Sequence, residues 1–415
     1  MPDHNPNFAE QLQRYAELVI RSGCNLQPGQ ELLLSASTDC VEFARALTAA
    51  AYAAGARHVT VRFGDEGISR LHYEHAALEV FESFPEWLAL LNNSMAEGGA
   101  AVLSLTSEDP LALKGVDQAK LVANARAAHA ACKPFYDALD LGRTVWCIVG
   151  AASPAWAQHV FPNLGAEQAT EQLWQAIFKT VRLDSDDPIA AWEAHRASFN
   201  ERKAWLNAQH FDALHYFSSL GTDLTIGLNQ QGLWQGGGDT LTNGRPFFPN
   251  MPTEEIFTTP DRLRADGVVF SSMPLVHHGN LIEDFWLRFE GGRMVECQAR
   301  TGQDVLQAIF DVDEGACHLG ECALIPWTSP IRQTGLLFYN TLFDENASCH
   351  LAVGKGFPDC LVGGQEMDTA ALQAAGVNDS ATHVDFMIGT ADLQITGIGA
   401  DGRRTEVFHT GEWAF

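Results

Sequence analysis

Four separate segments in the second half of the chain place carboxylate or imidazole side chains among apolar and small residues. They read NMPTEEIFTTP (250–260), LGECALIP (319–326), LFYNTLFDENASCHLAVG (337–354) and THVDFMIG (382–389). Acids in such surroundings are usually paired or bound to a cation, because burying an unpaired charge is unfavourable. The four segments are therefore candidate parts of one metal site.

The segment HVDF (383–386) has the spacing of a β-strand with two polar side chains on one face. Residues two apart in a strand point to the same side, so His383 and Asp385 are expected to project together. A histidine beside a carboxylate is half of a metal site. Taken alone, such a pair is more often a solvated histidine and aspartate on the protein surface than a pair of metal ligands. The other three segments are what favour a ligand pair.

These other segments supply further acids and a histidine: Glu254, Glu255, Glu321, Asp344, Glu345 and His350. Oxygen and imidazole ligands without thiolate suit Zn²⁺, Mn²⁺ or Co²⁺, and several carboxylates indicate a bridged pair of metal ions. Two alternatives stay open. The groups can form buried hydrogen-bond networks, and His350, His383 and Asp385 alone match the two-histidine, one-carboxylate set of non-haem Fe(II) oxygenases.

The first half of the chain alternates apolar strands with Ala-rich helical stretches. Predicted strands are ELLLSA, HVTVRF, AVLSL (101–105) and TVWCIVG (144–150), with helices expected at 41–53, 77–95 and 117–138. Alternation of this kind is typical of α/β domains, in which a parallel sheet is covered by helices. We therefore predict an N-terminal α/β domain over residues 1–185.

A boundary is predicted at LDSDDPIAAW (183–192), where acidic residues precede Pro188, a residue that favours the first position of a helix. Beyond it, alternating segments such as LIEDFWLRFEGGRMVECQA are split by glycine turns, and EGGR (290–293) is a good hairpin connection. Residues 186–415 are therefore predicted to form a mainly antiparallel β (α+β) domain that carries the metal site.

The charge balance excludes some partners. The chain of 415 residues has 26 Lys and Arg against 52 Asp and Glu, a formal net charge of −26. Nucleic acids and anionic membranes would be repelled by such a protein. The N-terminal residues MPDHNPNFAEQ lack the features of a secretory signal, and no long apolar run follows, so we expect a cytoplasmic protein.

The four segments, in this order and at about these separations, resemble the M29 family of metal-dependent aminopeptidases. LQPGQELLLSA, WAQHVFP and GTDLTIGL also look like family segments, so the resemblance extends over most of the chain. It implies a cytoplasmic exopeptidase that acts on peptide substrates, holds two divalent metal ions (Zn, Co or Mn) in its second domain, and forms a homodimer.

Carried over residue by residue, the resemblance implies five metal ligands and one further acid, Glu345, as a candidate for ligation or for acid/base catalysis. The ligands are Glu255, Glu321, His350, His383 and Asp385, with Glu321 as the candidate bridge. Glu254 and Glu345 are candidates for acid/base catalysis by a carboxylate that accepts the proton of a metal-activated water. Ring-cleaving dihydroxypyridine dioxygenases look like relatives of this fold, so an Fe(II) dioxygenase is kept as the alternative, beside a metal-binding homologue without catalysis.

One position departs from the family pattern. Members commonly have Tyr seven residues after the histidine of the DENASCH block, in a segment resembling HLALGRAYP, whereas this chain has Phe357 in HLAVGKGFP. If the tyrosine hydroxyl stabilises the tetrahedral intermediate, this chain lacks that group. The protein would then hydrolyse peptides more slowly, act on a different substrate, or use a neighbouring hydrogen-bond donor in place of the tyrosine hydroxyl.

Overall fold

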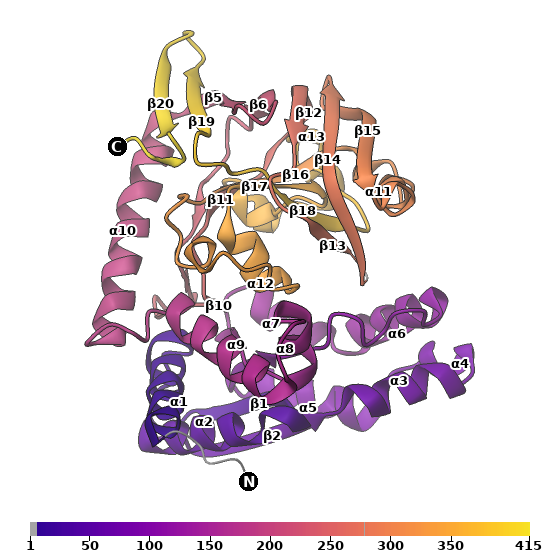
Figure 1. Cartoon of the computed structure of the whole chain (residues 1–415), viewed down its shortest axis with the longest axis vertical. Coiled ribbons are helices and arrows are strands. Elements are labelled where there is room, and N and C mark those ends of the chain that lie inside the picture. The colour runs from indigo at the N-terminus through magenta and orange to yellow at the C-terminus, as the bar shows by residue number, and fades with distance from the viewer. Residues whose placement is uncertain (1–5, 278) are drawn as a thin grey trace. The chain divides into compact units, whose positions relative to one another are not determined.

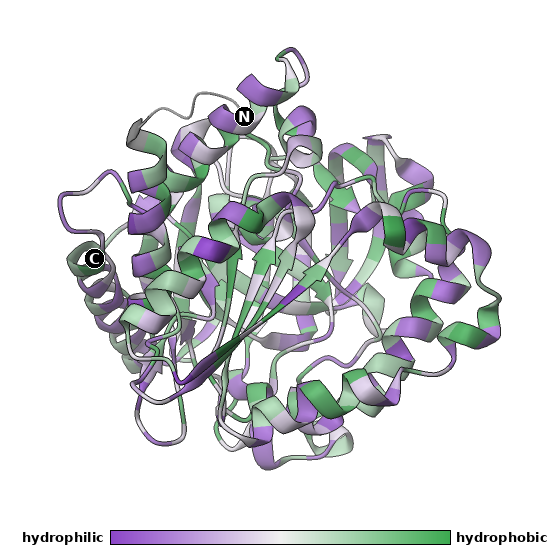
Figure 2. Cartoon of the chain, turned by 90° about the horizontal axis from the view of Figure 1, so that it is seen from below, coloured by the Kyte–Doolittle hydropathy of each residue, from purple (hydrophilic) through white to green (hydrophobic). Residues whose placement is uncertain are grey.

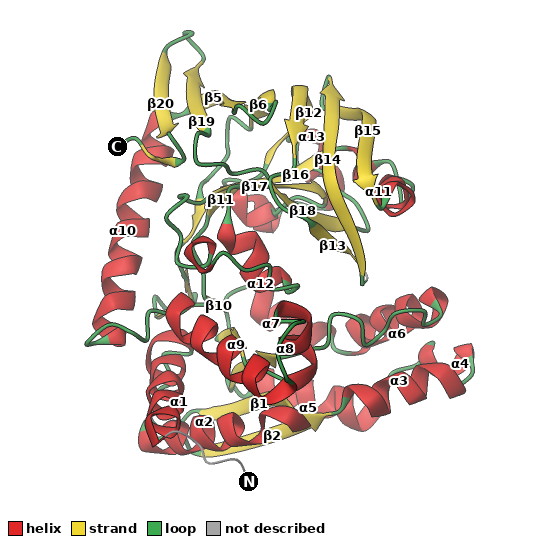
Figure 3. Cartoon of the chain, in the orientation of Figure 1, coloured by secondary structure: helices red, strands yellow, loops and turns green. Residues whose placement is uncertain are grey.

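A computed structural model describes residues 6–277 and 279–415 of the chain. It contains two compact units, each described separately below. The first comprises the N-terminal part through Ala194 together with Gly238–Thr253, and the second comprises His195–Gly237 and Glu254–Phe415. Helices predominate in the first unit and strands in the second (Figure 3).

The first unit is built on a five-stranded parallel sheet with the strand order β10-β4-β3-β1-β2 (Figure 1). Its strands are β1 (Glu31–Ser37), β2 (His58–Gly64), β3 (Ala101–Thr106), β4 (Trp146–Gly150) and β10 (Asn250–Met251). A short antiparallel pair, β8 (Asp239–Thr240) and β9 (Pro246–Phe247), lies outside this sheet.

Helices connect and cover these strands. They are α1 (Pro6–Leu18), α2 (Val41–Ala53), α3 (Glu66–His75), α4 (Leu78–Phe81), α5 (Glu86–Glu97), α6 (Gln118–Ala131), α7 (Lys133–Asp140), α8 (Pro154–Val160) and α9 (Ala166–Thr180). Helix α10 (Pro188–Gln209) begins in the first unit and belongs to the second from His195 onward. The short π-helix Val19–Gly23 follows α1, and the 3-10 turn Thr38–Cys40 precedes α2.

Apolar runs explain why this sheet forms. Leu32, Leu33 and Leu34 of β1 are fully buried, as expected for a parallel strand with both faces covered. Apolar and polar residues alternate along the helices, which is visible as green and purple stretches of their ribbons (Figure 2). Burial of the apolar sides against the sheet supplies the main stabilisation of the unit.

The larger sheet of the second unit is antiparallel and has nine strands, in the order β13-β14-β12-β6-β5-β19-β20-β21, with β15 also paired to β14. The strands are β5 (Phe211–Phe217), β6 (Asp223–Leu228), β12 (Pro260–Phe270), β13 (Leu275–His277), β14 (Asn280–Glu290), β15 (Arg293–Thr301), β19 (Gln394–Gly399), β20 (Arg404–His409) and β21 (Glu412–Trp413). Its buried side chains form one apolar core with those of the smaller sheet and of helix α11 (Gln303–Phe310).

The smaller sheet of this unit has the strand order β18-β17-β16-β11-β7. These strands are β7 (Gln235–Gly236), β11 (Ile256–Thr258), β16 (Leu319–Leu324), β17 (His350–Gly354) and β18 (His383–Met387). Two short helices, α12 (Thr341–Asp344) and α13 (Thr369–Ala374), lie in the connections that precede β17 and β18. Each of the four acid-containing segments contributes one strand to this sheet, namely β11, β16, β17 and β18.

The predicted fold class is confirmed, with a helix-covered parallel sheet at the N-terminus and mainly antiparallel sheets beyond it. The hairpin at EGGR is also confirmed, since Glu290 pairs with Arg293 and both intervening glycines have positive φ. The predicted helices 77–95 and 117–138 are each two helices, because Pro85 and Pro134 interrupt hydrogen bonding near the start of α5 and α7. The division at residues 185 and 186 stays a prediction.

No helix among residues 6–277 and 279–415 combines the length and the apolar character needed to cross a bilayer.

Candidate metal centre

The candidate ligands are collected by the strand register of the smaller sheet. Ala352 of β17 pairs with Glu321 of β16 on one side and with Asp385 of β18 on the other, so these three residues form a row across the sheet. His350 and His383 lie two residues from members of that row and therefore share its face. The small side chain of Ala352 leaves space between the surrounding polar groups.

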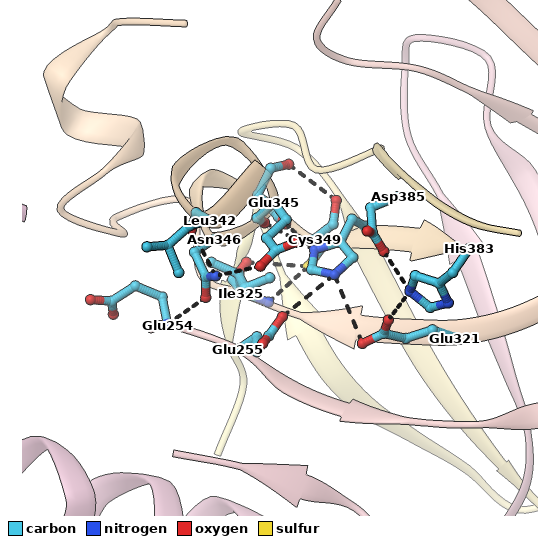
Figure 4. A network of polar contacts seen from close by, with 12 residues as sticks. Glu254, Glu255, Glu321, Ile325, Leu342, Glu345, Asn346, Cys349, His383 and Asp385 are labelled. Atoms are coloured by element: carbon cyan, nitrogen blue, oxygen red, sulfur yellow. Dashed lines mark hydrogen bonds and ion pairs between the residues drawn. The ribbon is translucent and has the colours of Figure 1, made fainter. Parts of the chain in front are cut away.

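Glu321 lies between the two histidines and faces each with a different oxygen. Its Oε2 is 3.2 Å from Nε2 of His383, and its Oε1 is 3.9 Å from Nε2 of His350. Glu255, which directly precedes β11, places Oε2 3.5 Å from His350, and Oδ1 of Asp385 lies 3.2 Å from Nε2 of His383. Figure 4 shows Glu255, Glu321, Glu345, Asp385 and His383 converging on one volume.

Two groups of potential ligand atoms result from this arrangement. Glu255, Glu321 and His350 form the first, and Glu321, His383 and Asp385 form the second, with the atoms of each group within 4.8 Å of one another. Glu321 belongs to both. The arrangement therefore brings together all five residues predicted as ligands, in two sets that share one carboxylate.

The hydrogen bonds of the imidazoles test whether these residues suit a metal ion. Nδ1 of His350 lies 2.9 Å from the carbonyl oxygen of Glu345, and Nδ1 of His383 lies 2.7 Å from that of Lys355. A carbonyl oxygen only accepts, so each Nδ1 carries the proton and each Nε2 is left to face carboxylates. Metal-ligating histidines are held in this way by a hydrogen bond from the distal nitrogen. The donor set fits divalent cations.

Burial and crowding of like charges shift the pKa values of the cluster. Burial, together with the charges of Glu321 and Asp385, raises the pKa of Glu255 to about 8 against the lowering effect of His350. Burial by itself would lower the pKa of His383, but its contacts with Asp385 and Glu321 raise it to about 11. The cluster thus holds protons when no cation is bound, and a bound cation would replace them.

The two acids predicted for acid/base catalysis occupy different surroundings. Burial raises the pKa of Glu345 well above its usual range, and the neighbouring Glu255 and Asp385 raise it further. Glu254 is 4% exposed and its carboxylate lies 3.6 Å from Nε2 of His195. In Figure 4 the side chain of Glu254 extends away from the convergent acids, whereas Glu345 lies among them.

Asn346 links these two acids and was not anticipated from the sequence. Its side-chain oxygen accepts the backbone N–H of Glu254 at 2.8 Å, and its Nδ2 donates to Oε1 of Glu345 at 3.3 Å. Asn346 is fully buried. The sequence signal for Asn346 was its position inside the DENA block, next to Glu345. A buried side-chain amide usually has hydrogen-bond partners, and an adjacent acid is one candidate.

Phe357 lies beside a candidate ligand. Its ring centroid is 5.0 Å from that of His383 and 5.6 Å from that of Phe257. Its backbone N–H donates to Oγ1 of Thr259 at 2.8 Å. The position that commonly carries a hydroxyl in the family is therefore close to the candidate centre, and in this chain it offers only an apolar ring.

Comparison with known proteins gives matches along nearly the whole chain. The model of the thermophilic metalloprotease (M29) family matches residues 8–413. Aminopeptidase AmpS of Bacillus subtilis is 44% identical over 409 residues, covering 99% of this chain and 100% of that protein. Aminopeptidase T of Thermus thermophilus is 43% identical over 406 residues, covering 98% and 99%.

A solved structure of one such relative has the same fold. Wild-type AmpT from Thermus thermophilus superposes with a TM-score of 0.91 at 42% identity, covering 98% of this chain and 100% of that one. A 2,5-dihydroxypyridine dioxygenase from Pseudomonas putida has a TM-score of 0.49 at 12% identity, which supports no conclusion about function. The family resemblance in the four sequence segments is confirmed: the chain belongs to the M29 family of thermophilic metalloproteases.

Proposed function

We propose that this protein is a metal-dependent aminopeptidase whose centre holds two divalent ions bridged by Glu321. The observation that supports this most directly is the division of the Glu321 carboxylate, with one oxygen toward His350 and the other toward His383. Relatives with 40–44% identity are named aminopeptidases, and they match over nearly their full lengths.

In this proposal Glu255, Glu321 and His350 hold one ion, and Glu321, His383 and Asp385 hold the other. Divalent ions at such sites supply Lewis acidity and an activated water for attack on a peptide carbonyl. The backbone carbonyls of Glu345 and Lys355 hold the imidazoles by Nδ1, so that both Nε2 atoms face the centre. The protein thereby fixes the ligand geometry before substrate arrives.

Glu345 is the acid that we assign to proton transfer. It is close enough to Glu255 and Asp385 for their charges to raise its pKa, and the amide of Asn346 contacts its Oε1. A carboxylate with a raised pKa binds a proton more tightly, which suits acceptance of a proton from water and its return to the leaving amine. Glu254 remains a second candidate for proton transfer. Its contact with His195 favours a role in positioning neighbouring groups instead.

Metal content and activity of the purified protein test the proposal together. The protein is stripped with a chelator, reloaded with Zn²⁺, Mn²⁺ or Co²⁺, and assayed for metal by mass spectrometry and for hydrolysis of leucine 4-nitroanilide. We expect two ions per chain and metal-dependent hydrolysis. N-acetyl-leucine 4-nitroanilide is the control, since an aminopeptidase needs a free amino terminus and should leave it intact.

Other outcomes separate the alternatives. One iron per chain with O₂ consumption on a dihydroxypyridine supports the dioxygenase instead, and bound metal with neither activity supports a homologue without catalysis. Cleavage of the acetylated anilide at the same rate would exclude an aminopeptidase. Zinc as the native ion, a cytoplasmic location and a homodimer remain predictions, of which sedimentation velocity tests the last.

A further inference from the structure

A small pocket opens beside the candidate centre. Its volume is about 40 Å³, and Glu345 and Asp385 are among the residues that line it. Four apolar residues also line it: Pro274, Leu275 and Val276 at β13, and Met387 from β18. Tyr339, Asn340, Thr341 and Asp344 complete the lining. The pocket therefore joins acids next to the proposed reaction centre to a short hydrophobic recess.

The size of this recess limits what can enter it. One bound water needs about 10–15 Å³ of cavity volume, so roughly three or four water-sized groups fit in the pocket. Alanine, valine and leucine side chains are of this size, whereas an aromatic ring is larger. One wall is also fixed, because Leu275 pairs with Ile282 of β14, and the carbonyl of Met387 accepts the N–H of Ser272 at 2.8 Å.

Asp344 holds the neighbouring loop that contributes Tyr339 and Asn340 to the pocket lining. Tyr339, which lines the pocket, has a φ of +56°, a conformation that L-residues adopt at a cost. The Asp344 carboxylate accepts the N–H groups of Phe338 at 2.7 Å and Asn340 at 3.0 Å, on either side of Tyr339. Asp344 thus keeps this loop in place, and widening the pocket would break these bonds.

We propose that this pocket receives the side chain of the substrate's N-terminal residue and restricts the enzyme to small and medium aliphatic residues. The inference rests on the proposed function. An aminopeptidase must place the first residue of its substrate at the reacting centre, and an apolar recess that adjoins the centre is where its side chain can be buried. Val276 and Met387 are then the specificity-determining residues.

The experiment compares kcat/KM for the 4-nitroanilides of alanine, leucine and phenylalanine, using the metal-loaded full-length protein. In the wild type, we expect leucine to exceed phenylalanine by about tenfold or more, since one misfit in an apolar pocket is worth about 10- to 200-fold. Val276→Ala should raise the phenylalanine value and bring the ratio toward one. Val276→Phe should lower the leucine value by about tenfold and alter the alanine value less.

Leu281→Ala is the matched control, because Leu281 pairs with Val276 across the hairpin but does not line the pocket. It should leave the leucine-to-phenylalanine ratio unchanged. Calorimetric titration with free L-leucine and L-phenylalanine gives a second readout that does not depend on turnover, and leucine should bind more tightly to the wild type.

Two failures are distinguishable. Absence of metal-dependent hydrolysis of every anilide overturns the proposed function and this inference with it. Hydrolysis of phenylalanine and leucine anilides with equal kcat/KM by the wild type, or a ratio that Val276→Ala does not change, overturns the pocket assignment alone. The wild-type comparison stands even if a variant fails to fold.

Discussion

Nε2 of His383 lies 3.2 Å from Oε2 of Glu321, although the strands that carry them, β18 and β16, are separated by β17. The contact spans the intervening strand at Ala352, whose short side chain does not obstruct it. Because Glu321 also faces His350 with its other oxygen, this carboxylate connects both groups of candidate ligands.

Loss of the Glu321 carboxylate should therefore impair both ion sites at once. We expect Glu321→Gln to reduce metal affinity by more than about 100-fold, since residues outside the ligand set already contribute about 10- to 100-fold. Metal content after dialysis and hydrolysis of leucine 4-nitroanilide should fall together. Glu314→Gln, at an exposed acid, is the control, and full metal content in Glu321→Gln would refute the bridge.

Metal affinity should rise with pH. The pKa of Glu255 is raised to about 8 and that of His383 to about 11, so both groups are mainly protonated at neutral pH without metal. Ligation displaces these protons, and each one released strengthens binding by about tenfold per pH unit. Chelator competition between pH 6 and 8 measures the slope, and calorimetry in buffers of different ionisation enthalpy counts the protons. A flat profile contradicts the assignment.

Substitution of Glu345 and of Glu254 should affect kcat to different extents. We expect Glu345→Gln to retain bound metal and to lose about 10²- to 10⁴-fold in kcat, the usual contribution of general acid–base catalysis. Glu254→Gln should have a smaller effect on kcat because its carboxylate contacts His195. Metal analysis and steady-state kinetics of both variants decide between them, and a larger loss in Glu254→Gln would reverse the assignment.

A hydroxyl at position 357 should increase activity. Phe357 packs beside His383, and one hydrogen-bond donor toward developing charge is worth about 10²–10³ in kcat at well-placed sites. We expect Phe357→Tyr to raise kcat by at least about tenfold with little change in metal content. Phe257→Tyr, at the neighbouring ring, is the control. An unchanged kcat would mean that this centre works without a donor there.

The space above Ala352 should be essential for metal binding. Ala352→Leu places a larger group in the row between Glu321 and Asp385, where overpacking typically costs about 1–3 kcal/mol. We expect a lower melting temperature and reduced metal content although every candidate ligand is retained. Ala352→Ser adds little volume and should preserve both properties. Normal metal content in the leucine variant would show that the ions lie elsewhere.

Much of the architecture was predictable because periodicity reports local structure. The buried run of β1, the helix at 41–53 and the EGGR turn were each expected from residue type and spacing, and each is present. The breaks within 77–95 and 117–138 were not expected. Alanine-rich stretches favour helix throughout, and the positions of the interruptions depend on prolines and packing.

The sequence by itself determined which residue types could form the centre, since acids and histidines stand out as polar groups within four apolar segments, and the family resemblance selected Glu255, Glu321, His350, His383 and Asp385 among them. It could not determine their pairing. Strand register decides that Ala352 separates Glu321 from Asp385, and loop contacts decide that Glu345 joins the cluster while Glu254 extends toward His195. Register and loop packing arise from contacts between distant segments, so only the tertiary structure specifies them.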